Sequence, residues 1–211
     1  MSINDTVQIS AAASDSGITP IVRVPGFQHF HATRVLDGGA MGIVFPHVDT
    51  AETASELANF CRYPPQGQRS IVGALPQIDF NSIPVSEAAK AINDAVLVIV
   101  MLESPEAIEN SHSIAAVDGV DVLLVGTGDL TMEMGIPGQI DNPKVVAAYE
   151  KVISACREHG KYPGLGGVYK PDLMQQYIAM GMRFILSTND LSMMMQASSE
   201  RAAFLRNLPV S

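Results

Sequence analysis

Two acidic residues follow long apolar stretches of the sequence, and together they could hold a divalent cation. Glu103 ends the run 96–102, and Asp129 follows the run 122–125 and the short segment 126–128. Continuous apolar runs are typical of parallel strands buried on both faces. Residues just past the carboxyl ends of such strands carry the chemistry of open sheets and barrels. Two carboxylates at one edge would suit a hard divalent ion. The alternative is that both acids cap the helices that follow them.

Arg23 and a glycine-containing turn are candidates for binding an anion. Arg23 lies inside the apolar segment 20–25, where strand interiors are usually buried and a solvated charge is rare. Its planar guanidinium could face a small carboxylate or an enolate, or it could form a structural salt bridge with a carboxylate of the fold. Gly126, Thr127 and Gly128 offer backbone N–H groups beside Asp129 with little side-chain bulk, which suits a substrate carboxylate.

The histidines and the other motifs point to no further chemistry. His47, just past an expected strand, is the best placed of the five histidines, although a role in stabilising a loop is favoured. His112 and His159 fall on expected helices and should lie at the surface. No His-x-x-x-His or Cys-x-x-Cys spacing supports a zinc site. The dinucleotide fingerprint fails at Thr131, no P-loop lysine is present, and no Gly-x-Ser-x-Gly elbow occurs.

Composition places the chain among compact globular proteins and excludes several classes. Hydrophobic residues make up 47% and charged residues 17% of the 211 residues, which favours one domain spanning 1–211. The net charge of −9 argues against a nucleic-acid partner. The polar first residues do not resemble a signal peptide, and the apolar runs are too short for a membrane partner. Two cysteines do not indicate a disulfide framework, so a cytoplasmic location is expected.

The order of elements predicts an α/β fold with about six strand–helix units. Their connections are all consistent with parallel strands, so the units could form a doubly wound sheet or three quarters of an eight-fold barrel. Residues 62–69 are expected to be irregular, and the segment 70–86 is expected to be a long loop of the kind that often serves as a lid. Strands are expected near 20–25, 42–45, 96–102, 122–125, 163–168 and 183–186, and helices near 1–17, 30–36, 49–61, 88–93, 105–117, 143–160, 171–180 and 190–208.

Five segments carry a resemblance that covers essentially the whole chain. They are TPIVRVP at 19–25, RVLDGGAMGIVFPHVDTAE at 34–52, RYPPQGQRS at 62–70, LESPEAIEN at 102–110 and VDGVDVLLVGTGDL at 117–130. In this order and spacing they resemble the HpcH/HpaI aldolase family of metal-dependent (class II) pyruvate aldolases. The combination is much more specific than any one segment.

The resemblance implies a (β/α)8 TIM barrel and reversible, divalent-metal-dependent cleavage of a 4-hydroxy-2-oxo acid into pyruvate and an aldehyde. It implies Glu103 and Asp129 as metal ligands for Mg²⁺ or Mn²⁺, with Co²⁺ as a further candidate. It also implies Arg23 as a catalytic and substrate-binding residue, and the backbone of 126–128 as the pyruvate carboxylate site. Asp37 matches a catalytic acid that pairs with a histidine across a subunit boundary. A homo-oligomer, trimer or hexamer, is expected.

The sequence departs from the family pattern in three places. Thr127 and Gly128 replace the usual proline and small residue, and Met101 replaces a common glutamine. The Asp-x-Glu-His motif of the second barrel strand would fall just before Met1, so an incomplete barrel without its first two strands and its general base is expected. This leaves open a catalytically impaired or dead paralogue that acts as a binding or assembly protein. A citryl-CoA-lyase-like enzyme is disfavoured, because an acidic chain lacks a basic patch for the CoA phosphates.

Overall fold

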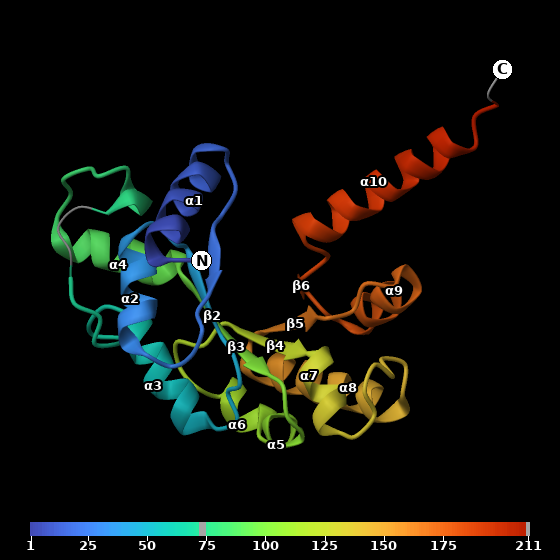
Figure 1. Ribbon diagram of the computed structural model, residues 1–211. Coiled ribbons are helices and arrows are strands. Elements are labelled where there is room, and N and C mark those ends of the chain that lie inside the picture. Colours follow the sequence, from blue (N-terminus) through green and yellow to red (C-terminus); the bar gives the residue numbers. More distant parts are fainter. Residues whose placement is uncertain (72–74, 210–211) are drawn as a thin grey trace.

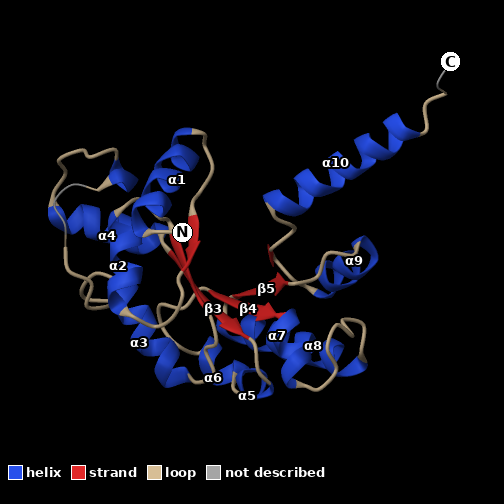
Figure 2. Cartoon of the chain, viewed as in Figure 1, coloured by secondary structure: helices blue, strands red, loops and turns tan. Residues whose placement is uncertain are grey.

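The structure, a computed structural model, describes residues 1–71 and 75–209, in which strands and helices alternate along the chain (Figures 1 and 2). Each strand pairs in parallel with the next one, so the spatial order of the six-stranded sheet is the chain order. The sheet curls into an arc, which confirms the expected incomplete TIM-type barrel. The strands are β1 (Ile21–Arg23), β2 (Gly42–Phe45), β3 (Leu97–Leu102), β4 (Val122–Gly126), β5 (Tyr162–Gly166) and β6 (Phe184–Ile185).

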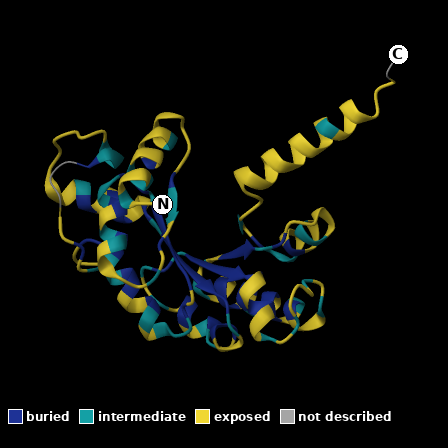
Figure 3. Ribbon diagram, in the orientation of Figure 1, coloured by how far each residue is buried: buried dark blue, intermediate teal, exposed yellow. Residues whose placement is uncertain are grey.

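Helices connect the strands and cover the outer side of the curled sheet (Figure 1). The final helix extends away from the rest of the molecule, and none of its residues is buried (Figure 3). The helices are α1 (Ile3–Asp15), α2 (His29–Asp37), α3 (Ala51–Cys61), α4 (Val85–Ala95), α5 (Pro105–Glu109), α6 (Ser111–Ala115), α7 (Thr127–Glu133), α8 (Pro143–His159), α9 (Pro171–Met180) and α10 (Asp190–Arg206), with a 3-10 turn, η1 (Pro76–Ile78).

The central strands are apolar on both faces because each face has its own core. Val98, Val100 and Leu102 of β3 pack into the large cluster beneath the helices. Ile99 and Met101, which alternate with them, belong to a smaller cluster on the inner side of the arc. The continuous apolar runs of the sequence therefore reflect burial on both faces of the sheet.

Three details of the expected helices are corrected. Helix α3 begins at Ala51 and not at the expected residue 49, because Thr50 caps it and its hydroxyl accepts from the Thr53 N–H. The expected helix 105–117 is two short helices separated at Asn110, whose side-chain amide donates to the Asp49 carbonyl. The expected loop 70–86 contains η1 and the start of α4, while residues 72–74 lie outside the described part of the chain.

A buried arginine joins several elements at the amino end of the sheet. Arg62, which is 3% exposed, donates to the carbonyls of Asn93, Val96 and Gly119 and to the Asp121 carboxylate. The other contact of that carboxylate is the Val98 N–H at the start of β3. One guanidinium thus ties α3 to the approaches of β3 and β4. Within the described residues, no helix has the length and apolarity needed to cross a membrane.

We expect Arg62→Met to lower the free energy of unfolding by about 3 kcal/mol, because it leaves three buried carbonyls and a half-buried carboxylate without their donor. Urea unfolding followed by circular dichroism measures this loss. Lys90→Met is the control, since Lys90 and Asp94 form an exposed pair on α4 whose loss should cost less than about 0.5 kcal/mol. Equal losses for the two variants would contradict the assignment of Arg62 as a structural clamp.

Candidate functional site

Glu103 is a buried carboxylate immediately past the carboxyl end of β3. It continues the alternation of Ile99 and Met101, so its side chain lies on the inner side of the arc. Only 3% of the residue is exposed. Its Oε2 accepts the His47 backbone N–H at 2.8 Å and lies 3.3 Å from His47 Nδ1. The carboxylate is therefore held by the loop that follows the neighbouring strand β2.

Ser104, the residue after Glu103, makes a second connection to the segment that follows β2. The Ser104 hydroxyl donates to the Asp49 carboxylate at 2.5 Å and accepts from the Ala107 N–H at the start of α5. The segments that follow β2 and β3 are thus joined twice, once through Glu103 and once through Ser104. This pairing leaves the Glu103 side chain little freedom to turn away from the inner side of the sheet.

Asp129 brings a second carboxyl group to the same end of the sheet. Strand β4 runs directly into α7, and Asp129 is the third residue of that helix and is exposed. Burial raises the pKa of Glu103 above its ordinary value, the His47 N–H lowers it, and the nearby Asp129 carboxyl raises it again. Two acids delivered by adjacent strands are therefore close enough to influence one another, and their joint binding of a metal ion stays a prediction.

Gly126 leaves the space in which the Glu103 side chain lies. A Cβ built on Gly126 would lie 2.5 Å from Glu103 Cγ and 2.8 Å from Oε1, closer than real Cβ contacts allow. Gly126 also pairs in register with Gly166 of β5. Strands β4 and β5 thus present no side chain at the level of Glu103, and the inner side of the sheet stays open there.

Thr127 and Gly128 contribute only backbone groups to this part of the site. The Thr127 hydroxyl is fully buried, 2.5 Å from the Tyr149 hydroxyl, and donates to the Gly166 carbonyl at 2.6 Å. This contact anchors the start of α7 to α8 and β5. A Cβ on Gly128 would meet nothing within 4 Å, so the surface beside Asp129 is open.

Arg23 is exposed, contrary to the expectation of a buried strand charge. The reason is that β1 forms one edge of the sheet and is flanked only by β2. Ile21 packs against the inner cluster, so Arg23, two residues on, lies on the same side of the sheet as Glu103. The expected alternative, a salt bridge to a carboxylate of the fold, does not occur within the described part of the chain.

Asp37 lies at the other end of the sheet from Glu103. Helix α2 returns antiparallel to the strands, and Asp37 is its last residue. Its carboxylate accepts from Arg69 Nη2 at 2.8 Å, and the Arg69 guanidinium lies 4.6 Å above the centre of the Tyr63 ring. No hydrogen bond or ion pair joins Asp37 to Glu103 or Asp129 in the described structure. Its expected role across a subunit boundary stays a prediction.

His47 has a larger part in the site than sequence reasoning gave it. Its backbone has a positive φ of 53°, a conformation that costs free energy for a non-glycine residue. This conformation accompanies the double contact of its N–H and Nδ1 with Glu103. The expected loop-stabilising role therefore describes the residue correctly, but the group that it stabilises is the site carboxylate.

The chain is similar to known proteins over nearly its whole length. A family model described as HpcH/HpaI aldolase/citrate lyase matches residues 1–198. The chain is 40% identical to a 4-hydroxy-4-methyl-2-oxoglutarate aldolase of Hapsidospora irregularis, over 99% of this chain and 78% of that protein. It is 33% identical to a 4-hydroxy-2-oxo-heptane-1,7-dioate aldolase of Escherichia coli, over 87% of this chain and 70% of that protein.

A solved structure extends the similarity to three dimensions. The chain superimposes on an HpcH/HpaI aldolase from Desulfitobacterium hafniense DCB-2 with a TM-score of 0.92 at 30% sequence identity. The match covers 99% of this chain and 80% of that one. Sequence, fold and the matched family model agree, and the chain therefore belongs to the HpcH/HpaI aldolase/citrate lyase family.

Proposed function

We propose that this protein is a class II aldolase, a carbon–carbon lyase that reversibly cleaves a 4-hydroxy-2-oxo acid into pyruvate and a carbonyl compound, usually an aldehyde. The observation that carries the proposal is the buried Glu103 beside Asp129 at the carboxyl ends of β3 and β4. The aldolase relatives at 40% and 33% identity support the reaction class. The substrate named for the Hapsidospora relative is the first to test.

The donor set fits a hard divalent cation. Glu103 is almost fully buried, its hydrogen bond from the His47 N–H engages Oε2, and a second acid acts on it. A cation shared by Glu103 and Asp129 would relieve the repulsion between the two acids. Oxygen ligands favour Mg²⁺ or Mn²⁺, with Co²⁺ as a further candidate. When bound, such an ion supplies Lewis acidity toward the keto and carboxylate oxygens of the substrate.

Arg23 and the backbone of 126–128 are proposed to bind the substrate. Cleavage of the C3–C4 bond requires loss of the 4-hydroxyl proton and leaves the pyruvate fragment as an enolate. Arg23 has no ion-pair partner in the described structure and lies on the inner side of the sheet, so its guanidinium is available for that charge. The N–H groups of Gly126, Thr127 and Gly128 are the proposed donors to the pyruvate carboxylate.

A catalytically impaired binding or assembly protein is the second candidate function. Two observations favour it. Neither Arg23 nor Asp37 contacts Glu103 in the described structure, and the Asp37 carboxylate already pairs with Arg69. In such a protein the carboxylate pair would still bind a cation and a keto acid, but turnover would lack a proton-transferring group. Asp37 would then be a structural residue, and the two functions differ in turnover and not in binding.

We also propose a homo-oligomer, a trimer or a hexamer, in the cytoplasm. Helix α10 exposes a run of apolar side chains, Leu191, Met193, Met194 and Met195 near its start and Phe204 near its end. The two edges of the sheet, β1 and β6, are also unpaired in a single chain. The buried cysteines Cys61 and Cys156 are both free thiols, which suits a reducing compartment.

We expect the purified protein to release pyruvate from 4-hydroxy-4-methyl-2-oxoglutarate, to lose this activity in EDTA and to regain it with Mg²⁺ or Mn²⁺. Glu103→Gln and Asp129→Asn should each reduce kcat/KM at least about 100-fold, because each removes a charged oxygen ligand. Glu106→Gln, at an exposed acid in the first turn of α5, is the control and should keep full activity. Mn²⁺ binding without pyruvate release at any metal concentration would favour the binding protein.

Arg23→Lys keeps the positive charge but loses the planar fork, so we expect a fall in kcat of about 100-fold with Mn²⁺ affinity unchanged. Pyruvate release measures kcat, and quenching of Mn²⁺ paramagnetic resonance measures metal affinity. Arg34→Lys on α2, whose guanidinium lies 5.7 Å from the Phe30 ring, serves as the matched substitution. An unchanged kcat for Arg23→Lys would remove Arg23 from the proposed site.

Gly126→Ala should lower Mn²⁺ affinity at least about tenfold, because the new Cβ would displace the Glu103 side chain. Gly128→Ala is a matched control two residues away, since its Cβ enters open space and Mn²⁺ affinity should stay within about twofold. Titration calorimetry on both variants gives the comparison. Equal affinities would show that the packing of Glu103 against Gly126 does not hold the metal site.

Sedimentation equilibrium should give the mass of three or six chains for the wild-type protein. Leu191→Asp with Met194→Asp should reduce this mass, because charged groups would replace exposed apolar surface of α10. Gln196→Asp places the same charge at an exposed polar position of the helix and should leave the mass unchanged. A monomeric wild-type protein would contradict the proposed assembly.

A further inference from the structure

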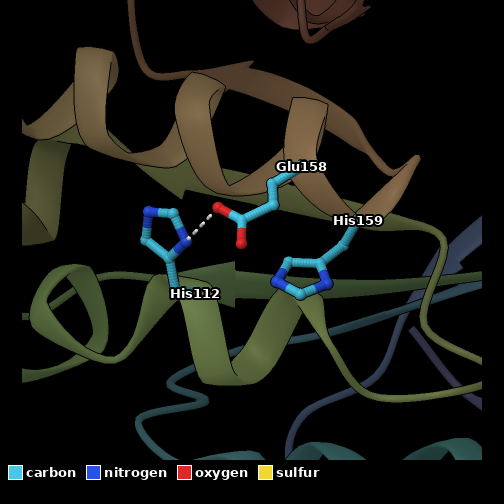
Figure 4. A group of neighbouring side chains, drawn as sticks. All are labelled: His112, Glu158 and His159. Carbon is cyan, nitrogen blue, oxygen red and sulfur yellow. Dashed lines mark ion pairs between the residues drawn. The ribbon is translucent and has the colours of Figure 1, made fainter.

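A second group of metal-binding side chains lies outside the proposed active site. His112 belongs to α6, while Glu158 and His159 are the last two residues of α8. Figure 4 shows the three side chains converging between the two helices. His112 Nδ1 lies 3.2 Å from Glu158 Oε2, and one ligand atom from each of the three residues lies within 4.8 Å of the others. The group unites residues that are 47 positions apart in the sequence.

Helix capping and core packing hold the backbone of these residues in place. Helix α8 has 17 residues, begins at the Asn142 cap and ends at Gly160, which adopts the left-handed conformation. Buried residues of both helices, Ile114 and Ala115 in α6 and Ala155 and Cys156 in α8, belong to the main core. The side chains of His112 and Glu158 are 43% and 63% exposed. The helices are therefore fixed, while ions and water can reach the ligand atoms.

The ligand set is suited to a transition-metal ion and not to Mg²⁺. Two imidazoles and one carboxylate, with water in the fourth position, form a common tetrahedral zinc arrangement. Bonds of about 2.1 Å to Zn²⁺ place tetrahedral ligand atoms about 3.4 Å apart. The pair His112–Glu158 already has this spacing. His159 needs to move its ring by roughly 1–1.5 Å, which rotation of an end-of-helix side chain can provide.

A plain surface ion pair does not account for the whole group. An exposed His–Glu pair contributes little to stability, and it requires no second imidazole. Here the His159 ring lies against the His112 ring in an edge-on arrangement, with centroids 6.3 Å apart. The carboxyl end of α8 also carries the negative end of the helix dipole, which favours a bound cation.

We propose that His112, Glu158 and His159 form a zinc-type site that clamps α6 to the end of α8. The site is separate from Glu103 and Asp129, because α8 returns antiparallel to the strands and ends just before the amino end of β5. Its ion stabilises the packing of the helices that flank β4 and takes no part in the aldol chemistry. The protein thus holds two divalent-ion sites of different hardness at opposite ends of the sheet.

The test uses the full chain, stripped of metal, in excess Mg²⁺ so that the carboxylate site near β3 and β4 is occupied. We expect Zn²⁺ to bind at one equivalent by calorimetry, Co²⁺ to give the visible absorption of a tetrahedral site, and Zn²⁺ to raise the melting temperature. His112→Gln with His159→Gln should abolish all three responses, and Glu158→Gln should weaken Zn²⁺ binding at least about tenfold. Without zinc, these partly exposed substitutions should leave the melting temperature unchanged.

His29→Gln combined with Glu200→Gln is the matched control, because it removes one histidine and one acid at exposed positions of α2 and α10. This control should bind Zn²⁺ and Co²⁺ as the wild-type protein does. Equal Zn²⁺ binding by the wild-type and His112→Gln/His159→Gln proteins, or the absence of any Zn²⁺ response in the wild type, would overturn the proposal. Residual Zn²⁺ binding that disappears only in Glu103→Gln would assign it to the active-site carboxylates and would equally overturn the proposal.

Discussion

The carboxylate of Glu103 is buried with far less compensation than an isolated ion requires. Removing an ionised carboxylate from water costs several kcal/mol even after the protein relaxes. The His47 N–H returns about 1.5–3 kcal/mol as a charge-assisted hydrogen bond. The nearby Asp129 makes the balance worse, since it raises the pKa of Glu103 further. Such a group requires either a proton or a cation, and a divalent ion shared with Asp129 would meet this requirement.

The stabilising polar contacts lie at the amino end of the sheet, whereas the candidate site lies at its carboxyl end. At the amino end, Arg62 bonds the approaches of β3 and β4 to α3 and α4, and Asp37 pairs with the buried Arg69. At the carboxyl end, the same strands deliver Glu103 and the start of α7. Barrel folds commonly show this division. Since the strands are parallel and in register, the hydrogen bonds at the amino end help to set where the carboxylates emerge.

The sequence was sufficient for the features that depend on strand burial and chain direction. The apolar runs before Glu103 and Asp129 identified two central strands, and parallel connections placed both acids at one end. The burial of Arg23 was predicted wrongly, because the apolar pattern of an edge strand resembles that of a central one. The break at Asn110 depends on a bond to the distant Asp49. The convergence of His112 and His159 likewise arises only from the packing of α6 against α8.

The lengths of the strands explain why an incomplete arc can support a site at its centre. Strands β3 and β4 have six and five residues, whereas the edge strands β1 and β6 have three and two. Short edges offer few unpaired backbone groups for unwanted pairing. The long central strands β3 and β4, which are buried on both faces, therefore lead directly to Glu103 and Gly126. Arg23 belongs to the weakly held edge, so its position relative to Glu103 depends on whatever packs against β1.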